Sequence, residues 1–261
     1  MMAEPQSVLS RLNRRQHKRR RPKWWAWLAI VIAIVGIMTA GFGGVHWWHL
    51  RHQIVLKKYP VTGVAIDQDA GFIDFQALSK TGLQFIYLKT TVGNRYTDDD
   101  FADNYQRSIG SSLKIGVYLT YSPNSTIMSQ VRYFHQQVGH STGTLPIMIV
   151  VPEGIGDLSD SAVLKKTTQR LTTMQVQLQQ QTDQPVGLWI APQQATKLDK
   201  SRTWRMLTLT DEPLKQHYQS NIDFISYDDS GSIIVDGSRQ SLNLMVYNGS
   251  KKMFETLATE N

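Results

Sequence analysis

The 261-residue chain contains no cysteine. This absence excludes a disulfide framework, a thiolate metal site and a lipid-modified cysteine anchor. A domain without disulfides must rely on the size of its core, and roughly 200 residues in one domain are enough to bury a full core. One sizeable folded domain plus an appendage is therefore the simplest organisation.

Charge is missing from residues 24–48, which contain no Asp, Glu, Lys or Arg. A helix of about 25 residues is roughly 37 Å long, enough to cross about 30 Å of hydrocarbon with some tilt. Tryptophan pairs stand near the two ends, at Trp24 and Trp25 and at Trp47 and Trp48, as in the aromatic belts of membrane interfaces. These residues are therefore predicted to form a single transmembrane helix rather than a buried core helix.

The formal net charge of +7 originates in the first 23 residues. Eight of the 28 basic residues and one of the 21 acidic residues lie there, which leaves 20 of each sign for the rest of the chain. Such a basic arm could bind nucleic acid or simply be solvated, but its position directly before the apolar stretch fits the positive-inside rule and attraction to anionic lipids. We therefore predict contact with membrane lipids through residues 11–48, and no nucleic-acid partner.

A cleavable signal peptide is the rival interpretation of the N-terminal region. The apolar segment is long for a signal peptide, and Met38-Thr39-Ala40 is a poor cleavage site. We favour an uncleaved, single-pass anchor in the cell membrane, with a cytoplasmic N-terminus and an extracytoplasmic C-terminal domain. The predicted organisation, by residue number, is a basic cytoplasmic tail at 1–23, the anchor helix at 24–48, a stalk at 49–60 and the folded domain at 61–261.

After residue 60, short apolar runs rich in β-branched and aromatic residues alternate with helical patterns. The predicted strands are 64–66, 85–88, 115–121, 147–151, 186–190, 206–209, 224–227 and 242–246, and the predicted helices are 75–80, 101–109, 127–138 and 161–181. A strand followed by a helix, repeated four times, implies parallel strands joined by crossovers. The fold class is therefore α/β: a (β/α) TIM-like barrel with an irregular second half, preceded by a single transmembrane helix.

Five blocks of sequence carry a family resemblance. They are G-V-A-I-D-Q-D-A-G-F-I-D-F (63–75), F-I-Y-L-K-T-T-V-G-N-R-Y-T-D-D-D-F-A-D-N-Y (85–105), I-G-V-Y (115–118), Q-V-R-Y-F (130–134) and L-P-I-M-I-V-V-P-E (145–153). In order and spacing they resemble the glycoside hydrolase family 25 lysozymes, muramidases that cut the β-1,4 link after N-acetylmuramic acid in peptidoglycan. The resemblance implies a barrel whose substrate groove lies at the carboxyl ends of the strands, where carboxyl groups protonate the leaving oxygen and stabilise the sugar cation.

The positions at which the family has acids carry other residues here. The Asp of the family's G-I-D-V-S falls on Ala65, and the Glu of its K-A-T-E-G falls on Val92. The Asp and the catalytic Glu of its D-x-E fall on Val150 and Pro152. Further along, the family's W-Q-Y and D-L-N correspond to residues 225–227 and 241–243. The resemblance thus implies a kept scaffold that has lost its catalytic carboxylates, whose removal lowers rates by orders of magnitude.

Two nearby acids are candidates to replace the lost groups. Asp67 lies two residues beyond Ala65, on the same strand face, and Glu153 lies one residue past the lost Glu position. The alternative is that Asp67 belongs to a polar turn and Glu153 to an exposed loop, which leaves no catalytic residue. Lys89 is interpreted as a structural charge partner of Asp74 or of a loop carboxylate.

Other candidate sites are fewer. Tyr118, Tyr121 and Tyr227 could line a glycan groove, because aromatic walls suit sugar stacking, and a place in the buried core is the equal alternative. The histidines lack partners at ligand spacing, so no metal site is predicted. No glycine-rich phosphate loop occurs, and no cofactor is predicted.

Three functions remain open from the sequence. The first is a membrane-anchored lysozyme-like domain that binds peptidoglycan glycan strands or an envelope protein without cleaving the glycan. The second is an active muramidase that uses Asp67 and Glu153 as replacement acids. The third is a protein-binding envelope scaffold that uses neither groove nor glycan.

Overall fold

The computed structural model describes residues 27–28, 31–34, 36, 57–198, 205–209, 214–215, 218 and 220–259. The chain divides into two compact units, Met1–Leu50 and Arg51–Asn261. The described residues of the first unit are helical, and most of the predicted transmembrane helix lies outside the described residues. Within the described part, no helix combines the length and the apolar character needed to span a membrane.

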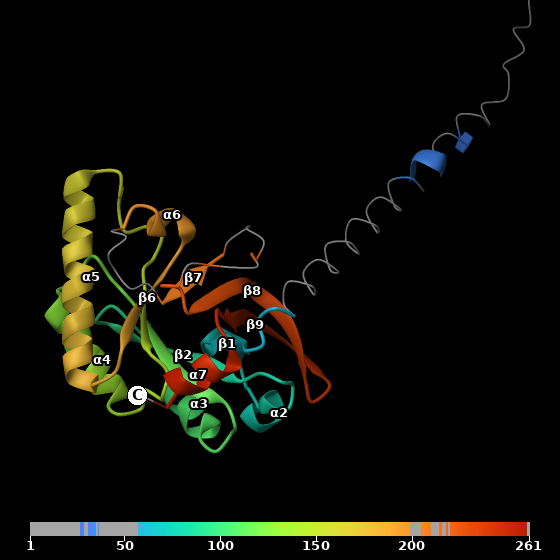
Figure 1. Ribbon diagram of the computed structural model, residues 1–261, viewed down its shortest axis with the longest axis horizontal. Coiled ribbons are helices and arrows are strands. Elements are labelled where there is room, and N and C mark those ends of the chain that lie inside the picture. Colours follow the sequence, from blue (N-terminus) through green and yellow to red (C-terminus); the bar gives the residue numbers. More distant parts are fainter. Residues whose placement is uncertain are drawn as a thin grey trace, which may run out of the picture. The chain divides into compact units, whose positions relative to one another are not determined.

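The second unit alternates strands with helices, as predicted (Figure 1). Its strands are β1 (Thr62–Ile66), β2 (Phe85–Val92), β3 (Tyr96–Thr97), β4 (Lys114–Thr120), β5 (Ile147–Val150), β6 (Val186–Ile190), β7 (Met206–Thr208), β8 (Phe224–Val235) and β9 (Ser238–Tyr247). Its helices are η1 (Gln68–Ala70), α2 (Phe75–Ser79), α3 (Phe101–Ser108), α4 (Ile127–Val138), α5 (Ser161–Thr182), α6 (Pro192–Ala195) and α7 (Lys251–Leu257).

Eight of the strands close into a barrel. The order is β1-β2-β4-β5-β6-β7-β8-β9, and β9 pairs back onto β1, while the short β3 extends β2 as a hairpin. Ala65 of β1 shows the closure, because it is in register with Tyr87 of β2 on one side and with Asn243 of β9 on the other. All neighbouring pairs from β1 to β8 are parallel.

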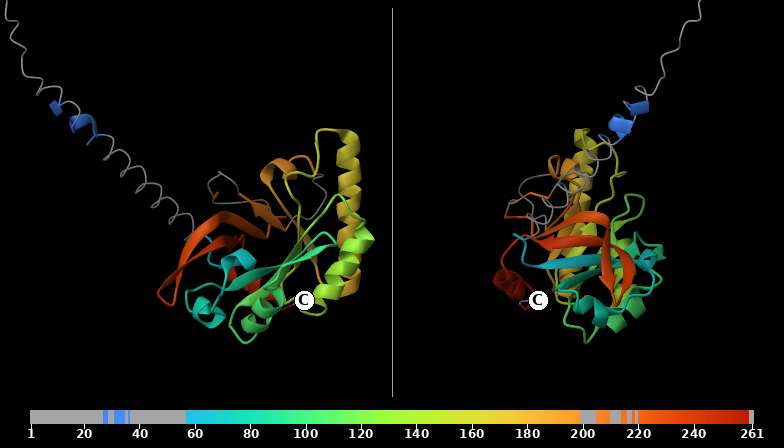
Figure 2. Two further views of the ribbon diagram at one scale, coloured as in Figure 1. Left: turned by 180° about the vertical axis from the view of Figure 1, so that it is seen from behind. Right: turned by 90° about the vertical axis from the view of Figure 1, so that its right-hand side faces the viewer.

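Strand β9 departs from the parallel arrangement that the sequence predicted. It runs antiparallel to both β8 and β1. The reason is local: β8 and β9 are joined only by Asp236 and Gly237, which both have positive φ, at 47° and 78°. A two-residue turn of this kind joins antiparallel strands, whereas a parallel crossover needs a dozen or more residues. The barrel is therefore a mixed one, and its last hairpin reaches beyond the neighbouring strands (Figure 2).

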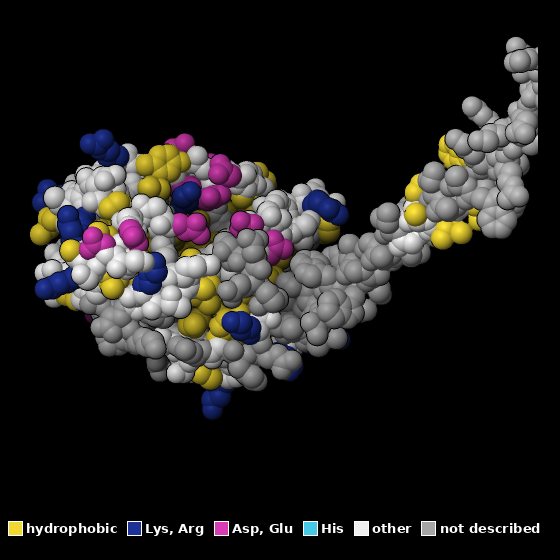
Figure 3. All heavy atoms as spheres, turned by 90° about the horizontal axis from the view of Figure 1, so that it is seen from above, with side chains coloured by type: hydrophobic (Ala, Val, Ile, Leu, Met, Phe, Trp, Pro, Cys, Tyr) yellow, Lys and Arg dark blue, Asp and Glu magenta, His cyan; other side chains and the backbone are white. Residues whose placement is uncertain are grey.

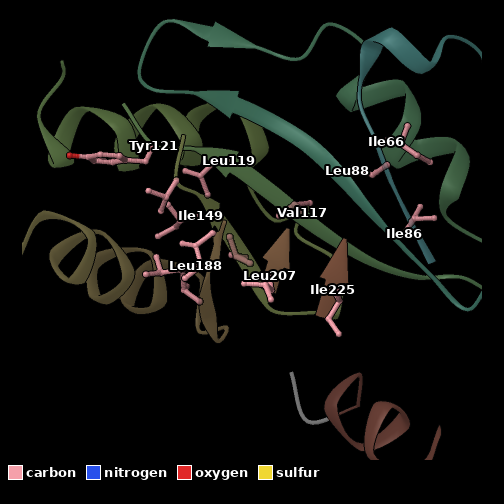
Figure 4. Close-up of a cluster of buried hydrophobic side chains, with 14 of the residues drawn as sticks. Ile66, Ile86, Leu88, Val117, Leu119, Tyr121, Ile149, Leu188, Leu207 and Ile225 are labelled. Carbon is pink, nitrogen blue, oxygen red and sulfur yellow. The ribbon is translucent and has the colours of Figure 1, made fainter. Parts of the chain in front are cut away.

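Side chains that point outward from the barrel form the larger hydrophobic cluster. Ile86, Val117, Ile149 and Leu188 belong to it, together with helix residues such as Met174 of α5. Figure 4 shows part of this cluster, with apolar side chains of successive strands lying next to one another. Because successive residues of a strand point to opposite faces, the alternate residues are left to fill the barrel.

The alternate residues form a second, inner cluster with a high aromatic content. Its members include Ala65, Phe85, Tyr87, Tyr118, Met148, Trp189, Met206, Phe224, Met245 and Tyr247. At the end of the barrel where the parallel strands begin, Phe254 of α7 packs its ring 5.6 Å from Phe85 and 5.3 Å from Tyr247. That end is therefore closed by aromatic side chains.

The predicted stalk also needs correction at its last residues. Tyr59 is 5% exposed and belongs to the outer cluster, and its hydroxyl donates to the carbonyl oxygen of Lys215 at 2.6 Å. The chain before β1 is thus packed into the domain from Tyr59 onward, because an aromatic ring beside a folded core is more stable buried than in water.

Candidate functional site

The parallel strands end on one face of the barrel, seen in Figure 3. We call this face the mouth and define it by Asp67, Lys89, Asp98, Tyr118 and Trp189. Acidic side chains gather on it around a basic one (Figure 3). This is the edge at which barrels of this kind carry their sites, because loops from several strands meet there.

The four positions at which the family resemblance placed acids lie at strand ends. Ala65 is 5% exposed and is part of the inner cluster, and Val150 packs against that cluster. Val92 is the last residue of β2 and pairs with Tyr96 of β3. Pro152 follows β5, and its carbonyl oxygen accepts a hydrogen bond from Gln194 Nε2 at 2.8 Å. None of these four side chains can transfer a proton.

Asp67 and Lys89 form an ion pair at the mouth. Lys89 Nζ lies 3.3 Å from Asp67 Oδ2, and both side chains are partly buried. Asp67 also accepts the backbone N–H of Asp69, because it caps the short helix η1. Of the two partners predicted for Lys89, the structure shows the loop carboxylate, while Asp74 instead caps α2 through the N–H of Ala77.

Glu153, the second candidate acid, occupies a different setting. It lies exposed in a turn after β5, where the chain leaves the barrel toward α5. Its exposure agrees with the interpretation of a loop residue that the sequence left open.

Asp98 was not singled out in the sequence but is the most buried acid of the mouth, at 2% exposure. Its carboxylate accepts the backbone N–H groups of Gln68 at 3.0 Å and Asp100 at 3.2 Å. Gln68 Oε1 in turn accepts from the hydroxyl of Tyr96 and from the N–H of Asp99. These bonds clamp the loop after β1 to the β3 hairpin, which holds Asp67 in place.

Burial raises the pKa of Asp98, while the N–H donors of Gln68 and Asp100 lower it by a smaller amount. Desolvation thus outweighs hydrogen bonding, since the charged form loses more hydration than two amides return. The sequence offered no signal for this residue, because three consecutive aspartates before a helix look like an ordinary polar turn.

Tyr118 is the aromatic residue of the predicted groove that faces the barrel interior. Its ring stands edge-to-face against Trp189, with centroids 5.1 Å apart at 61°. Burial raises the pKa of its hydroxyl well above the ordinary value, and the charges of Asp67, Asp98 and Asp69 raise it further. All three carboxylates therefore lie within electrostatic reach of this hydroxyl.

The structure does not bring Tyr121 and Tyr227 together with Tyr118. Tyr121 is buried in the outer cluster, where its hydroxyl accepts from Arg170 Nε at 2.6 Å. Tyr227 packs against the same outer cluster, and burial, followed by the charge of Asp228, raises its pKa to about 12. Tyr121 thus bonds to α5, and both side chains pack in the outer cluster instead of forming a wall with Tyr118.

Two polar pairs line the inner wall below the mouth. Trp189 Nε1 donates to the hydroxyl of Thr208 on the next strand. The hydroxyl of Ser226 lies 2.7 Å from Asn243 Oδ1, at two of the positions that correspond to the family's W-Q-Y and D-L-N. Each of these polar groups is satisfied by its neighbour.

Two other features concern ligands. Among the described residues, no group of three or more His, Asp or Glu side chains could hold a metal ion. A hollow of about 640 Å³ follows α5, lined by Ser161, Leu164, Lys165, Thr168, Gln169, Thr172, Thr173 and Lys197. Its lining comes from α5 and the turn after α6, so it is separate from the mouth.

Comparison with known proteins matches residues 66–184 to the model of Glycosyl hydrolases family 25. The uncharacterized protein YegX of Escherichia coli strain K12 is 32% identical over 119 residues, which are 44% of this chain and 43% of that protein. The autolytic lysozyme of Clostridium acetobutylicum is 32% identical over 79 residues, which are 30% of this chain and 24% of that protein. The chain thus matches less than half of the length of these relatives.

Solved structures show the same fold over a larger span. A family 25 glycosyl hydrolase from Bacillus anthracis has a TM-score of 0.66 at 21% identity, over 77% of this chain and 95% of that chain. A lysozyme from Streptomyces coelicolor has a TM-score of 0.62 at 19% identity, over 77% of this chain and 97% of that chain. The barrel therefore has the fold of these proteins, and residues 66–184 carry the sequence pattern of family 25.

Proposed function

We propose that the chain is a membrane-anchored, extracytoplasmic protein of glycoside hydrolase family 25 that binds peptidoglycan without cleaving it. The match of residues 66–184 to the family, the lysozymes among its relatives and the shared barrel fold support this assignment. Anchoring rests on the uncharged, tryptophan-flanked residues 24–48 and the basic residues before them.

The chemistry of four side chains supports the proposal that the chain does not cleave the glycan. Hydrolysis of a glycosidic bond requires one carboxylic acid that protonates the leaving oxygen and a second carboxylate that acts as nucleophile or base. At the corresponding strand ends the chain has Ala65, Val92, Val150 and Pro152, of which Ala65 is buried among inner-cluster side chains. An apolar side chain supplies neither function.

The replacement acids predicted from the sequence do not fit the two roles. Asp67 is already paired with Lys89 at 3.3 Å and accepts the N–H of Asp69 as the cap of η1, which is a structural role. Glu153 is exposed, outside the apolar setting in which glycosidases hold a general acid. The enzyme hypothesis built on Asp67 and Glu153 therefore lacks a matched pair of carboxyl groups.

The test is incubation of the full chain, purified in detergent, with peptidoglycan sacculi, followed by co-sedimentation and by assay of new reducing ends. We expect the protein to sediment with the sacculi and to release no reducing ends. Detergent micelles without protein and sacculi without protein serve as controls.

Release of reducing ends that disappears in Asp67→Asn or Glu153→Gln would instead establish an active muramidase. Failure to sediment, with no release, would leave the protein-binding scaffold as the function of the barrel.

A further inference from the structure

We propose that the mouth recognises its saccharide through a free ammonium group, as on an amino sugar that lacks its N-acetyl group. This inference rests on the proposed glycan-binding function and names the class of sugar that the same mouth takes. The family similarity does not dictate it, because a neutral N-acetylated sugar would fit the same fold.

The first observation is the excess of negative charge at the mouth. Asp67, Asp69 and Asp98 all act on the hydroxyl of Tyr118, and Lys89 is the cation that acts on Asp98. Lys89 is committed to Asp67 at 3.3 Å, which leaves the exposed Asp69 without an ion pair among the described residues. Three carboxylates against one ammonium give the mouth a negative potential that attracts a cationic ligand.

The second observation is independent of charge and concerns the hydroxyl of Tyr118. The side chain is only 9% exposed, yet none of the hydrogen bonds among the described residues involves its hydroxyl. The hydroxyl is not among the fully enclosed unpaired atoms of the described residues, so it can be reached from solvent and can bond to an atom of a bound molecule. Lys89, the partner of Asp67, is in register with Tyr118 on the neighbouring strand, which places the ion pair and the hydroxyl at the same part of the mouth.

The aromatic rings at this point add a further attraction for a cation. Tyr118 and Trp189 stand edge-to-face in the wall of the barrel, with centroids 5.1 Å apart. Both rings are buried in the inner cluster, so they form an electron-rich wall beneath the acids that favours a nearby ammonium group. Acids on the rim above aromatic rings match an amino sugar better than they match an anionic one, whose carboxylate the rim would repel.

A substitution of Lys89 distinguishes a cationic sugar from a neutral one. Its ammonium already occupies Asp67, so a ligand ammonium must compete with it for the same carboxylate. Replacing Lys89 by methionine would remove the competitor and strengthen binding of a cationic sugar. A neutral sugar would lose a hydrogen-bond donor in the same variant and bind more weakly.

The experiment compares the full chain in detergent micelles with two probes, the β-1,4-linked tetramer of glucosamine and the tetramer of N-acetylglucosamine, by titration calorimetry at low salt. We expect the glucosamine tetramer to bind about tenfold more tightly, the effect of about one favourable charge interaction. Asp69→Asn and Tyr118→Phe should each weaken this binding, and Lys89→Met should strengthen it. The basic N-terminal residues are the same in all variants and cancel in the comparison.

Glu255→Gln is the matched control, because it removes one negative charge from the exposed helix α7, at the closed end of the barrel. It should leave both affinities unchanged. Equal or tighter binding of the acetylated tetramer would overturn the ammonium preference, and so would weaker glucosamine binding by Lys89→Met. If the protein still sedimented with peptidoglycan, the proposed function would stand. Loss of all binding, to both tetramers and to sacculi, would overturn both.

Discussion

Ala65 shows how a single position can change the chemistry of a barrel without changing its backbone. Its register with Tyr87 and Asn243 is the one that closes the barrel, so a residue of any polarity at this point keeps the ladder hydrogen bonds. Alanine needs no buried partner, whereas a carboxylate would have to be paired or hydrogen-bonded. If the proposed correspondence with the family's Asp holds, alanine at this position removes an acid together with the need to stabilise one.

Gly116 is a residue at which the inner cluster leaves no room for a methyl group. A Cβ there would lie 2.5 Å from Tyr87 Cε1, and Tyr87 is fully buried with its hydroxyl donating to the Pro146 carbonyl oxygen at 3.1 Å. We expect Gly116→Ala to lower the free energy of unfolding by about 1–3 kcal/mol through overpacking. Gly154→Ala is the control, since nothing lies within 4 Å of its Cβ. Denaturant unfolding of both variants measures the effect. Equal losses of unfolding free energy in the two variants would contradict overpacking as the cause.

The raised pKa of Asp98 predicts how stability changes with pH. Because burial raises this pKa above its ordinary value of 3.8, folding favours the protonated form. The stability it contributes is present below pH 3.8 and is lost as the pH rises through the raised pKa. Asp98→Asn cannot ionise and should be less stable by about 1 kcal/mol at low pH, because it loses one acceptor.

The difference in stability between wild type and Asp98→Asn should become smaller as the pH rises. Denaturant midpoints of both proteins, measured across the acid range, test this. A difference that widens with pH would mean that the N–H donors of Gln68 and Asp100 outweigh burial and favour the carboxylate.

At the scale of elements, α5 follows its sequence pattern closely. Leu171, Met174 and Leu178, which recur at helical spacing, are buried, and Val176, which falls off this stripe, is 47% exposed. We expect Met174→Ala to lower the free energy of unfolding by about 2–5 kcal/mol, the usual loss for a large side chain in a core. Val176→Ala should change it by less than about 0.5 kcal/mol. Thermal unfolding of the pair measures both, and similar losses would show that α5 is held by propensity and not by packing.

The sequence predicted the strands and long helices because their signals are local. Apolar runs of period two and stripes of period 3.6 are visible in a single segment. The direction of β9 was missed because hydrophobicity is the same for parallel and antiparallel strands, and the Asp236-Gly237 turn that decides it was not recognised. The strands of that hairpin also extend further than predicted, to Val235 and back from Ser238.

The position of a site residue can be predicted from the sequence only where it depends on the pattern of a single strand. Tyr118 and Tyr121 were grouped in one groove, although an alternation of period two over their spacing of three residues would have placed them on opposite faces. The contacts of Asp67 with Lys89 and of Trp189 with Thr208 depend on register between strands, which no local pattern contains. Asp98 depends on a loop conformation, and its burial could not be read from its neighbours in sequence.

At the scale of the whole molecule, the charge distribution separates two regions of the sequence. The first 23 residues carry a strong positive charge, whereas the remainder has equal numbers of acidic and basic side chains. A basic segment that stays in the cytoplasm and a neutral domain outside it agree with the orientation set by the positive-inside rule. The proposed ligand, peptidoglycan, would then lie on the same side of the membrane as the barrel.

The absence of cysteine makes this orientation directly measurable, because any thiol introduced into the chain is the only one. Ser232→Cys places it at an exposed position of β8, and Ser7→Cys places it in the basic tail. On intact cells from which any outer barrier has been removed, a membrane-impermeant maleimide should label the first variant and reach the second only after lysis. Labelling of Ser7→Cys in intact cells, or protection of Ser232→Cys, would reverse the orientation and separate the barrel from peptidoglycan. The two variants differ from the wild type only at the position of the new cysteine. A difference in labelling between them therefore reports which side of the membrane the reagent can reach.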